Sequence, residues 1–381
     1  MKSIVYVLAV SAALYSCSGS KNASGFELKG NLLNSKGESV YLEKLTQKGT
    51  EVVDSTVIDE KGEFLMKNYT PEVGFYRLRI NNSNFAMLVL DSAQKVTVKG
   101  DARDLGNTFT AEGSPDTELF LEYNRMAQNQ KRRTDSLENI FRTALITQKM
   151  DSLTADSLSK ELQKPYETMI AQYSEQVAKK IRENTGSFAS IMAIQQLKPE
   201  TYMDVYMALD AGLQKKYPNS EDIRSFHGMV QQTQLMVARV EATKIGNEAP
   251  ELILPTPDNK ELALSSLRGK VVLIDFWASW CGPCRKEMPN VKLMYQKYKD
   301  KGFEIYGVSL DKDRDAWLAA IEKDGLKWPQ VSDLKFWQSE AAQTYAVQSI
   351  PHTVLIDKDG RILAAGLRGA ELEAKVAEAL R

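Results

Sequence analysis

Two cysteines separated by two residues are the side chains of this sequence best suited to chemistry. Cys281 and Cys284 stand in the stretch WCGPC at 280–284, and the chain has one further cysteine, Cys17. A disulfide stabilises a fold mainly by constraining the unfolded chain, and the benefit grows with the length of the loop that it closes. A bond between Cys281 and Cys284 would close a loop of only about four residues. The pair is therefore a poor structural crosslink, and we interpret it as a redox centre.

The residues on either side of this pair predict how a sulfur could be activated. The apolar run KVVLIDFW at 270–277 is typical of a strand buried on both faces, and we expect a helix directly after the cysteines. Cys281 would then stand at a helix start, where unpaired N–H groups and the helix dipole favour negative charge. Lowering its pKa from about 8.5 to about 7 would populate the thiolate at neutral pH. We expect Cys281 to attack a substrate disulfide and Cys284, one turn on and less exposed, to release the product.

Three neighbouring residues fit this arrangement. Pro283 suits the first turn of a helix, where a missing N–H costs least, and Pro289 falls inside the same helix. Asp275 lies in the middle of the apolar run, so burial should raise its pKa. Such a carboxyl could exchange a proton with Cys284. The alternative is that Asp275 faces solvent at the end of its strand.

The composition limits the other classes of chemistry. Lys and Arg number 49 and Asp and Glu 50, which gives a net charge of −1 and argues against a nucleic-acid partner. Two histidines and three cysteines are too few for a zinc site of the usual Cys/His spacing. We therefore expect no metal and no cofactor other than a redox-active disulfide between Cys281 and Cys284.

The N-terminus predicts export. Lys2 precedes the apolar run IVYVLAVSAAL, which is too short to span a bilayer as a stable anchor and is followed by Cys17 and the polar SGSKNASG. This pattern resembles a bacterial lipoprotein signal, with 1–16 removed, Cys17 lipidated and 17–24 forming a tether. Tyr15 is bulkier than the residue usual at its position, and a plain secretory signal with an incidental cysteine is the alternative. Either reading places the mature chain outside the cytoplasm.

Residues 25–112 are predicted to form a small all-β domain. In FYRLRI at 75–80, Tyr76, Leu78 and Ile80 alternate with arginines, as in a half-buried strand. Six similar short runs occur in this region, some separated by the turn-like NSKG and DEKG. About seven short strands at this spacing are typical of a sandwich or barrel.

The residue composition and the hydrophobic pattern change twice after that domain. Residues 113–245 are predicted to be helical, because only three glycines stand between Gly113 and Gly246. We expect paired helices around the polar segment near residue 150, with one helix beginning at Pro165. Residues 246–381 alternate between strand-like and helix-like runs, which predicts an α/β domain.

The sequence around the cysteines resembles the thioredoxin superfamily over 246–381. Asp275 stands six residues before Cys281, and Pro289 stands five after Cys284. The resemblance implies a thioredoxin fold in which Cys281 is the nucleophile, Cys284 resolves the mixed disulfide and Asp275 exchanges the proton. Thioredoxins also carry a lysine on the adjoining strand, but FEIYGVSL has none.

A second part of the resemblance concerns substrate binding. Ile350 and Pro351 precede the strand HTVLID, where the family has its cis-proline. The resemblance implies that Pro351 packs against the disulfide and that the backbone of Ile350 pairs with substrate. Trp280 would cover one side of the cysteine pair, either as a substrate contact or by simple packing. Gly282 and Pro283 are the dipeptide found in reducing thioredoxins.

The exported setting and the helical segment RDAWLAAIEKDGLKWPQVSD resemble TlpA/ResA-like proteins, and the β-rich domain resembles an uncharacterised domain in lipoproteins of Bacteroidota. These resemblances imply a tethered thiol–disulfide oxidoreductase facing the periplasm, more a reductase than an oxidase. Its partners would be protein disulfide clients and an upstream electron donor. The alternatives are an isomerase, if the chain is oligomeric, and a partner-binding protein with an ancillary thioredoxin module. Peroxidase activity is disfavoured because Ala278 and Ile274 replace the residues that peroxiredoxins need.

Overall fold

The computed structural model describes residues 25–46, 48–68, 73–81, 83–147 and 151–381. The predicted signal peptide at 1–16, the lipidation site Cys17 and the tether at 17–24 therefore lie outside the described residues. The chain divides into two compact units, 1–230 and 231–381, and each is treated separately. The domain limits drawn from the sequence stay a prediction.

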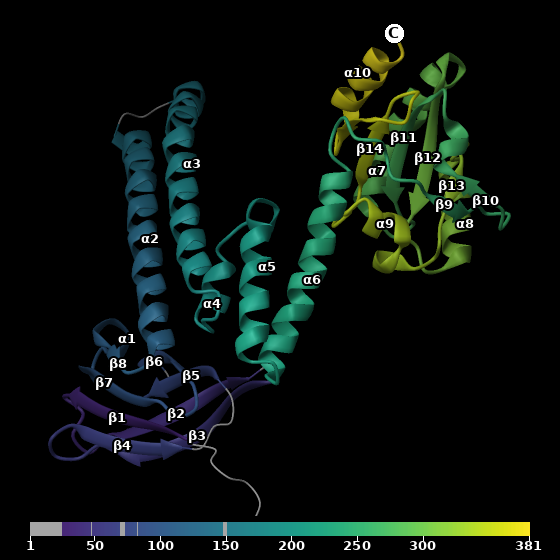
Figure 1. The fold of residues 1–381 in the computed structure, drawn as a ribbon. Helices are drawn as coiled ribbons and strands as arrows, with labels where there is room; N and C mark the ends of the chain where they lie inside the picture. Colours follow the sequence, from purple (N-terminus) through teal and green to yellow (C-terminus); the bar gives the residue numbers. More distant parts are fainter. Residues whose placement is uncertain (1–24, 47, 69–72, 82, 148–150) are drawn as a thin grey trace, which may run out of the picture. The chain divides into compact units, whose positions relative to one another are not determined.

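The β-rich part of the first unit is built from two four-stranded sheets (Figure 1). One has the order β4-β1-β7-β8, formed by Glu63–Asn68, Phe26–Leu33, Lys95–Asp101 and Thr110–Glu112. The other has the order β3-β2-β5-β6, formed by Gly49–Val57, Ser39–Thr46, Gly74–Arg79 and Phe85–Leu90. Strands β1 to β7 match the seven runs seen in the sequence, and β8 is an additional short strand.

Alternation along the strands explains how these sheets pack. In β5, Tyr76 and Leu78 are buried, while Arg77 and Arg79 point the other way and bind the buried carboxylate of Glu43. The buried faces of the two sheets share one apolar core, to which both contribute, for example through Leu28, Phe64 and Val98 of one sheet and Leu42, Leu78 and Leu88 of the other. Two sheets packed on a common core make this domain a sandwich, which confirms the small all-β prediction.

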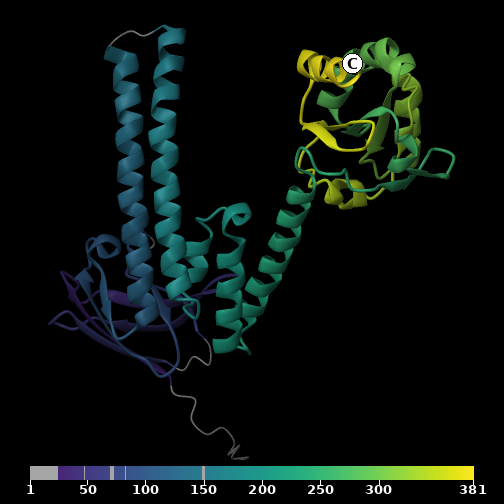
Figure 2. The same cartoon turned by 45° about the horizontal axis from the view of Figure 1, so that its top comes forward.

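Helices form the rest of the first unit. They are α1 (Leu105–Thr108), α2 (Pro115–Thr147), α3 (Ser152–Glu183), α4 (Ser190–Ile194), α5 (Pro199–Lys216) and the first part of α6 (Glu221–Ala242). Figures 1 and 2 show α2 and α3 running side by side as a long hairpin, as the pairing near residue 150 predicted. Their ends near the sandwich share a second core with the outer face of β5 and β6, where Phe75 and Val89 pack against Phe120 and Phe188.

The predicted helix start at Pro165 is wrong. Helix α3 begins at Ser152, because the side chain of Asp151 caps it by accepting a hydrogen bond of 2.8 Å from the N–H of Thr154. Pro165 lies inside α3 and is exposed. A proline inside a helix removes one backbone hydrogen bond, and on a solvent-facing side water can satisfy the carbonyl that is left.

A five-stranded mixed sheet organises the second unit, with the order β13-β12-β11-β14-β15. These strands span Gln330–Val331, Phe303–Ser309, Val271–Trp277, His352–Ile356 and Ile362–Ala365. The helices are α7 (Gly282–Tyr298), α8 (Arg314–Asp324), α9 (Glu340–Thr344) and α10 (Gly369–Ala379), and β9 (Ile253–Pro255) pairs with β10 (Glu261–Ala263) as a hairpin. This is the predicted α/β domain. Short elements such as β13 and α9 were not anticipated from the sequence.

The central strand β11 separates two apolar cores. All seven of its residues are buried, and β11 runs parallel to β12 and antiparallel to β14. Val271, Leu273 and Trp277 belong to the core that contains α7, whereas Val272, Ile274 and Phe276 belong to the other core. Because successive side chains of a strand alternate between faces, Asp275 points to the α7 side. In the described part of the chain, no helix is both long enough and apolar enough to cross a membrane.

Candidate active site

The two cysteines lie at the first turn of α7 and are joined by a disulfide. Cys281 is the N-cap residue of α7, its Cα lies 5.3 Å from that of Cys284, and its Sγ accepts a hydrogen bond of 3.1 Å from the Cys284 N–H. Cys281 is 4% exposed and Cys284 1%. The start of a helix has backbone N–H groups without helical partners, so the sulfur of Cys281 occupies a position that favours an anion after reduction.

A buried aspartate fixes the segment that enters this turn. Strand β11 ends at Trp277, and Asp311, just after β12, is 1% exposed. Its carboxylate accepts hydrogen bonds from the N–H and the hydroxyl of Ser279, at 2.9 and 2.6 Å, and from the hydroxyl of Ser309 at 2.7 Å. Because Ser279 stands two residues before Cys281, these bonds hold the approach to the redox pair. Sequence reasoning missed this anchor, since nothing local links the two segments.

Asp275 is buried on the face of the sheet that α7 covers. It lies opposite Gly307 of β12 and Thr353 of β14 and is 5% exposed. Loss of hydration raises its pKa to about 7, and the negative charge of Glu287 adds to the rise. The alternative of a solvent-facing Asp275 is therefore wrong. Its proposed proton exchange with Cys284 stays a prediction, supported by their common face of the sheet.

Glu287 is a site residue that sequence reasoning missed. It follows Cys284 by three residues on α7, which places both side chains on the same side of the helix. Its carboxylate accepts a hydrogen bond of 3.1 Å from the N–H of Gly369, the first residue of α10. The charge of Glu287 disfavours ionisation of Asp275. The spacing from Cys284 was the one signal that could have identified it.

The Ile350–Pro351 peptide bond is cis, in the position that the family resemblance predicted. The guanidinium of Arg368 donates a hydrogen bond to the carbonyl of Pro351, and the hydroxyl of Thr353 donates to the carbonyl of Leu367 at 2.7 Å. The loop before α10 therefore holds the cis-proline segment. Ile350 is partly buried and packs against the core that contains both cysteines.

His352 follows the cis-proline but serves as packing. Its ring lies against that of Phe276 with 6.0 Å between centroids. Burial lowers its pKa, and the nearby charge of Arg368 lowers it further, so His352 is held neutral. We assign it no step in the chemistry.

The other motif residues occupy distinct environments. Trp280 is 47% exposed. Pro283 is in the first turn of α7, and Pro289 lies inside the same helix. A Cβ at Gly282 would meet no atom within 4 Å, so packing does not require glycine there.

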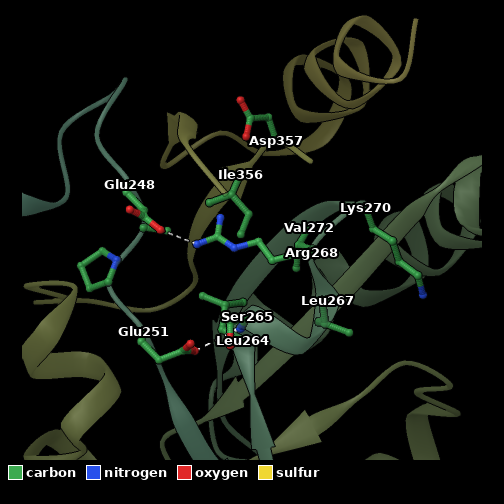
Figure 3. A pocket seen from close by; sticks show the side chains of 12 residues that line it. Glu248, Glu251, Leu264, Ser265, Leu267, Arg268, Lys270, Val272, Ile356 and Asp357 are labelled. Carbon is green, nitrogen blue, oxygen red and sulfur yellow. Dashed lines mark hydrogen bonds and ion pairs between the residues drawn. The ribbon is translucent and has the colours of Figure 1, made fainter. Parts of the chain in front are cut away.

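A cavity of about 300 Å³ lies elsewhere in this unit, near the start of β11 and the end of β14. Figure 3 shows that Arg268 crosses it toward Glu248. The guanidinium donates a hydrogen bond of 2.7 Å to the carboxylate of Glu248, and Glu251 accepts hydrogen bonds from the N–H groups of Ser265 and Leu252. The guanidinium also binds the carbonyl of Asp359. These charges are satisfied within the protein, so we assign the cavity no chemistry.

The raised pKa of Asp275 predicts a pH dependence of stability. In the unfolded chain this carboxyl ionises near pH 4, whereas in the folded protein it holds its proton up to about pH 7. Between these values the folded state binds the extra proton, so stability falls as the pH rises through this window. The full cost of ionising Asp275 is on the order of 4 kcal/mol. Asp275→Asn should therefore stabilise the oxidised protein at pH 8 and have little effect at pH 4.

Chemical unfolding of both proteins at the two pH values measures this difference. Asp258→Asn, at an exposed carboxylate in the turn between β9 and β10, is the matched control and should show no comparable pH-dependent gain. Equal stability of Asp275→Asn and the unaltered protein at pH 8 would contradict a costly buried carboxylate.

Comparison with known proteins agrees with this geometry. Residues 244–380 match the Redoxin family, and residues 26–120 match a domain of unknown function, DUF4369. The thiol-disulfide oxidoreductase ResA of Bacillus cereus is 34% identical over 144 residues, which cover 38% of this chain and 81% of that protein. ResA of Bacillus thuringiensis is 38% identical over 123 residues, covering 32% of this chain and 69% of that protein.

A solved structure is also similar. The thioredoxin domain of a thiol-disulfide oxidoreductase from Bacteroides vulgatus is 37% identical, and the match covers 36% of this chain and 99% of that domain with a TM-score of 0.35. The ResA relatives are similar to the region that carries the Cys281–Cys284 disulfide, the buried Asp275 and the cis bond before Pro351. The chain therefore belongs to the ResA-type thiol-disulfide oxidoreductases of the thioredoxin superfamily.

Proposed function

We propose that the protein is a membrane-tethered reductase of protein disulfides outside the cytoplasm. The observation that carries this proposal is the Cys281 sulfur at the start of α7, with the N–H of Cys284 directed at it. Its substrates are disulfide-bonded client proteins. An upstream dithiol donor is needed to reduce the Cys281–Cys284 disulfide after each cycle.

The reaction requires two exchanges. The Cys281 thiolate attacks one sulfur of the client disulfide, forms a mixed disulfide and releases the other client sulfur as a thiolate, which takes up a proton. Cys284 then loses its proton, with Asp275 as the acceptor, and attacks Cys281 Sγ. The second client thiolate leaves and is protonated, so two electrons have passed to the client and the Cys281–Cys284 disulfide is restored.

The charges beside Cys284 support the reducing direction. A dithiol pair becomes a strong oxidant when its reduced form is stabilised. Here Glu287 follows Cys284 by three residues on the same side of α7, and a negative charge at that spacing opposes formation of a second anion. The adjacent cation, Arg285, is bound to Asp324 through two hydrogen bonds of 2.7 Å. These interactions leave the helix start as the main source of thiolate stabilisation.

The reduction potential of the pair tests the direction of electron flow. We expect a value near about −270 mV, while a value near about −120 mV would assign the protein to the oxidants. Glu287→Gln should make the potential less negative by on the order of 10–30 mV, because it removes a charge that opposes the thiolate. Glu322→Gln, at an exposed carboxylate of α8, is the control and should leave it unchanged.

Insulin reduction and trapping of a mixed disulfide distinguish the reductase from a binding protein. Reduced protein should cleave insulin disulfides, and Cys284→Ser should accumulate a mixed disulfide with its client that Cys281→Ser does not form. Function that persists in Cys281→Ser would instead favour the partner-binding alternative.

We also propose that Cys17 is the lipidated N-terminus and that the enzyme faces the periplasm. The support is the short apolar run followed by Cys17 and a polar segment. Cys17→Ser should move the protein from the membrane fraction to the soluble periplasmic fraction, as seen by cell fractionation. Membrane association of Cys17→Ser equal to that of the unaltered protein would contradict the lipid anchor.

A disulfide isomerase is the second candidate, favoured by the free end of the α2–α3 hairpin. Between Gln130 and Met169, none of the side chains that the structure describes is buried, although Leu137, Phe141 and Leu162 line a common groove. A second copy could cover such a surface and bring two redox centres to one client. The reductase proposal predicts a monomer in gel filtration that does not reactivate scrambled ribonuclease. A dimer that does so would replace it with the isomerase.

A further inference from the structure

Three exposed aromatic side chains meet beside the redox pair. Trp280 contacts Phe336 and Trp337 with 5.2 and 6.1 Å between ring centroids, and the last two rings are 6.0 Å apart. Their exposed fractions are 47%, 38% and 37%. We call these three residues the aromatic cluster. Trp280 is the immediate neighbour of Cys281, so the cluster begins at the redox centre.

The clustering distinguishes these residues from ordinary exposed apolar side chains. In 244–381, six large hydrophobic residues are exposed, and three of them form the aromatic cluster, while the other three are Ile245, Ile253 and Leu293. Single exposed apolar residues are common on soluble proteins, but a contiguous patch marks a site of interaction. Aromatic residues are also enriched at protein interfaces.

The segment that carries Phe336 and Trp337 is held in a specific conformation. Leu334 and Phe336 have φ angles of 55° and 56°, in the left-handed region that residues other than glycine seldom adopt. The hydroxyl of Ser332 accepts a hydrogen bond from the N–H of Leu334, and the carboxylate of Asp333 accepts one from the N–H of Glu340 at 2.8 Å. An uncommon backbone shape thus keeps both rings at the surface beside Trp280.

A client bound at Cys281 comes close to this surface, because Trp280 is the residue next to Cys281. Its reacting sulfur bonds to Cys281, and an extended chain advances by about 3.3–3.6 Å per residue. The ring of Trp280, the residue next to Cys281, lies 5.2 Å from that of Phe336 and 6.1 Å from that of Trp337, measured between centroids. A side chain one or two positions from the client cysteine can therefore reach them.

We propose that the aromatic cluster selects clients, by binding an aromatic or large aliphatic side chain within two residues of the reacting cysteine. The preferred substrate is then an extended or unfolded polypeptide segment, in which such a side chain is free to bind, rather than a polar peptide. This inference rests on the proposed reductase function and adds Phe336 and Trp337 to the residues that determine specificity. The interaction acts before and during formation of the mixed disulfide and leaves the electron balance unchanged.

Two matched peptides test the proposal with the reduced full-length protein. Each is a symmetrical disulfide of a short single-cysteine peptide, with Phe next to the cysteine in one and Ser in the other. We expect the reduced protein to react with the Phe peptide about tenfold faster, as the second-order rate constant of a single turnover, because one buried aromatic contact can contribute that factor. Trp337→Ala should lower this preference to about twofold, and Trp337→Phe should restore most of it.

Controls keep the outcomes distinct. Phe336→Asn removes a second ring with a residue that tolerates the left-handed conformation, so it provides an independent variant if Trp337→Ala fails to fold. Leu293→Ala, at an exposed apolar residue outside the aromatic cluster, should keep the full preference. Hydroxyethyl disulfide, which lacks a flanking side chain, reports whether the protein reduces disulfides at all.

Equal rates for the two peptides with the unaltered protein would overturn the inference while leaving the reductase function standing. An equal fall for both peptides in Trp337→Ala, with the preference retained, would also overturn it and make the aromatic cluster a structural feature. Failure to reduce either peptide or hydroxyethyl disulfide would overturn the proposed function, and the inference with it.

Discussion

The hydrogen bond from the Cys284 N–H to the sulfur of Cys281 determines what this protein can do. It forms because α7 begins at this point, where the N–H groups of a first turn have no carbonyl partners within the helix. Once the disulfide is reduced, the same donor faces a thiol that can become an anion. The helix start therefore distinguishes the two sulfurs, because Cys281 caps the helix and Cys284 lies inside it.

The rest of the second unit keeps this helix start in place. Strand β11, at the centre of the sheet, leads directly to the first turn of α7. Asp311 holds the segment between them through its hydrogen bonds to Ser279. Arg368 holds the cis-proline segment by donating a hydrogen bond to the carbonyl of Pro351. The contacts come from segments far apart in the sequence, so the redox pair depends on the complete sheet rather than on its local motif.

The two carboxyl groups of Asp275 and Glu287 add a second, electrostatic constraint. Burial raises the pKa of Asp275, and the negative charge of Glu287 raises it further. A thioredoxin-like lysine is absent from β12, where Gly307 lies opposite Asp275. The proton of Asp275 is therefore held to near-neutral pH by burial and by a second carboxylate. A pKa near neutral is what the proposed proton exchange with Cys284 requires.

The sequence predicted the local features of the fold and the site, because period-2 patterns and the WCGPC motif are local. Strand β5, the placement of Cys281 at a helix start and the burial of Asp275 belong to this class. Local signals were misleading at Pro165, because the Asp151 cap starts the helix earlier. The bonds from Asp311 to Ser279 and the contact of Phe336 with Trp280 were not predictable, since each joins segments that only the tertiary fold brings together.

The ionisation of Cys281 tests the central claim most directly. Thiolate absorbance of the Cys284→Ser protein can be followed against pH, with the double variant Cys281→Ser/Cys284→Ser as the baseline. The account predicts a pKa near about 7 for Cys281, because the start of α7 stabilises the anion. A pKa at or above about 8.5, the value of a free cysteine, would contradict it.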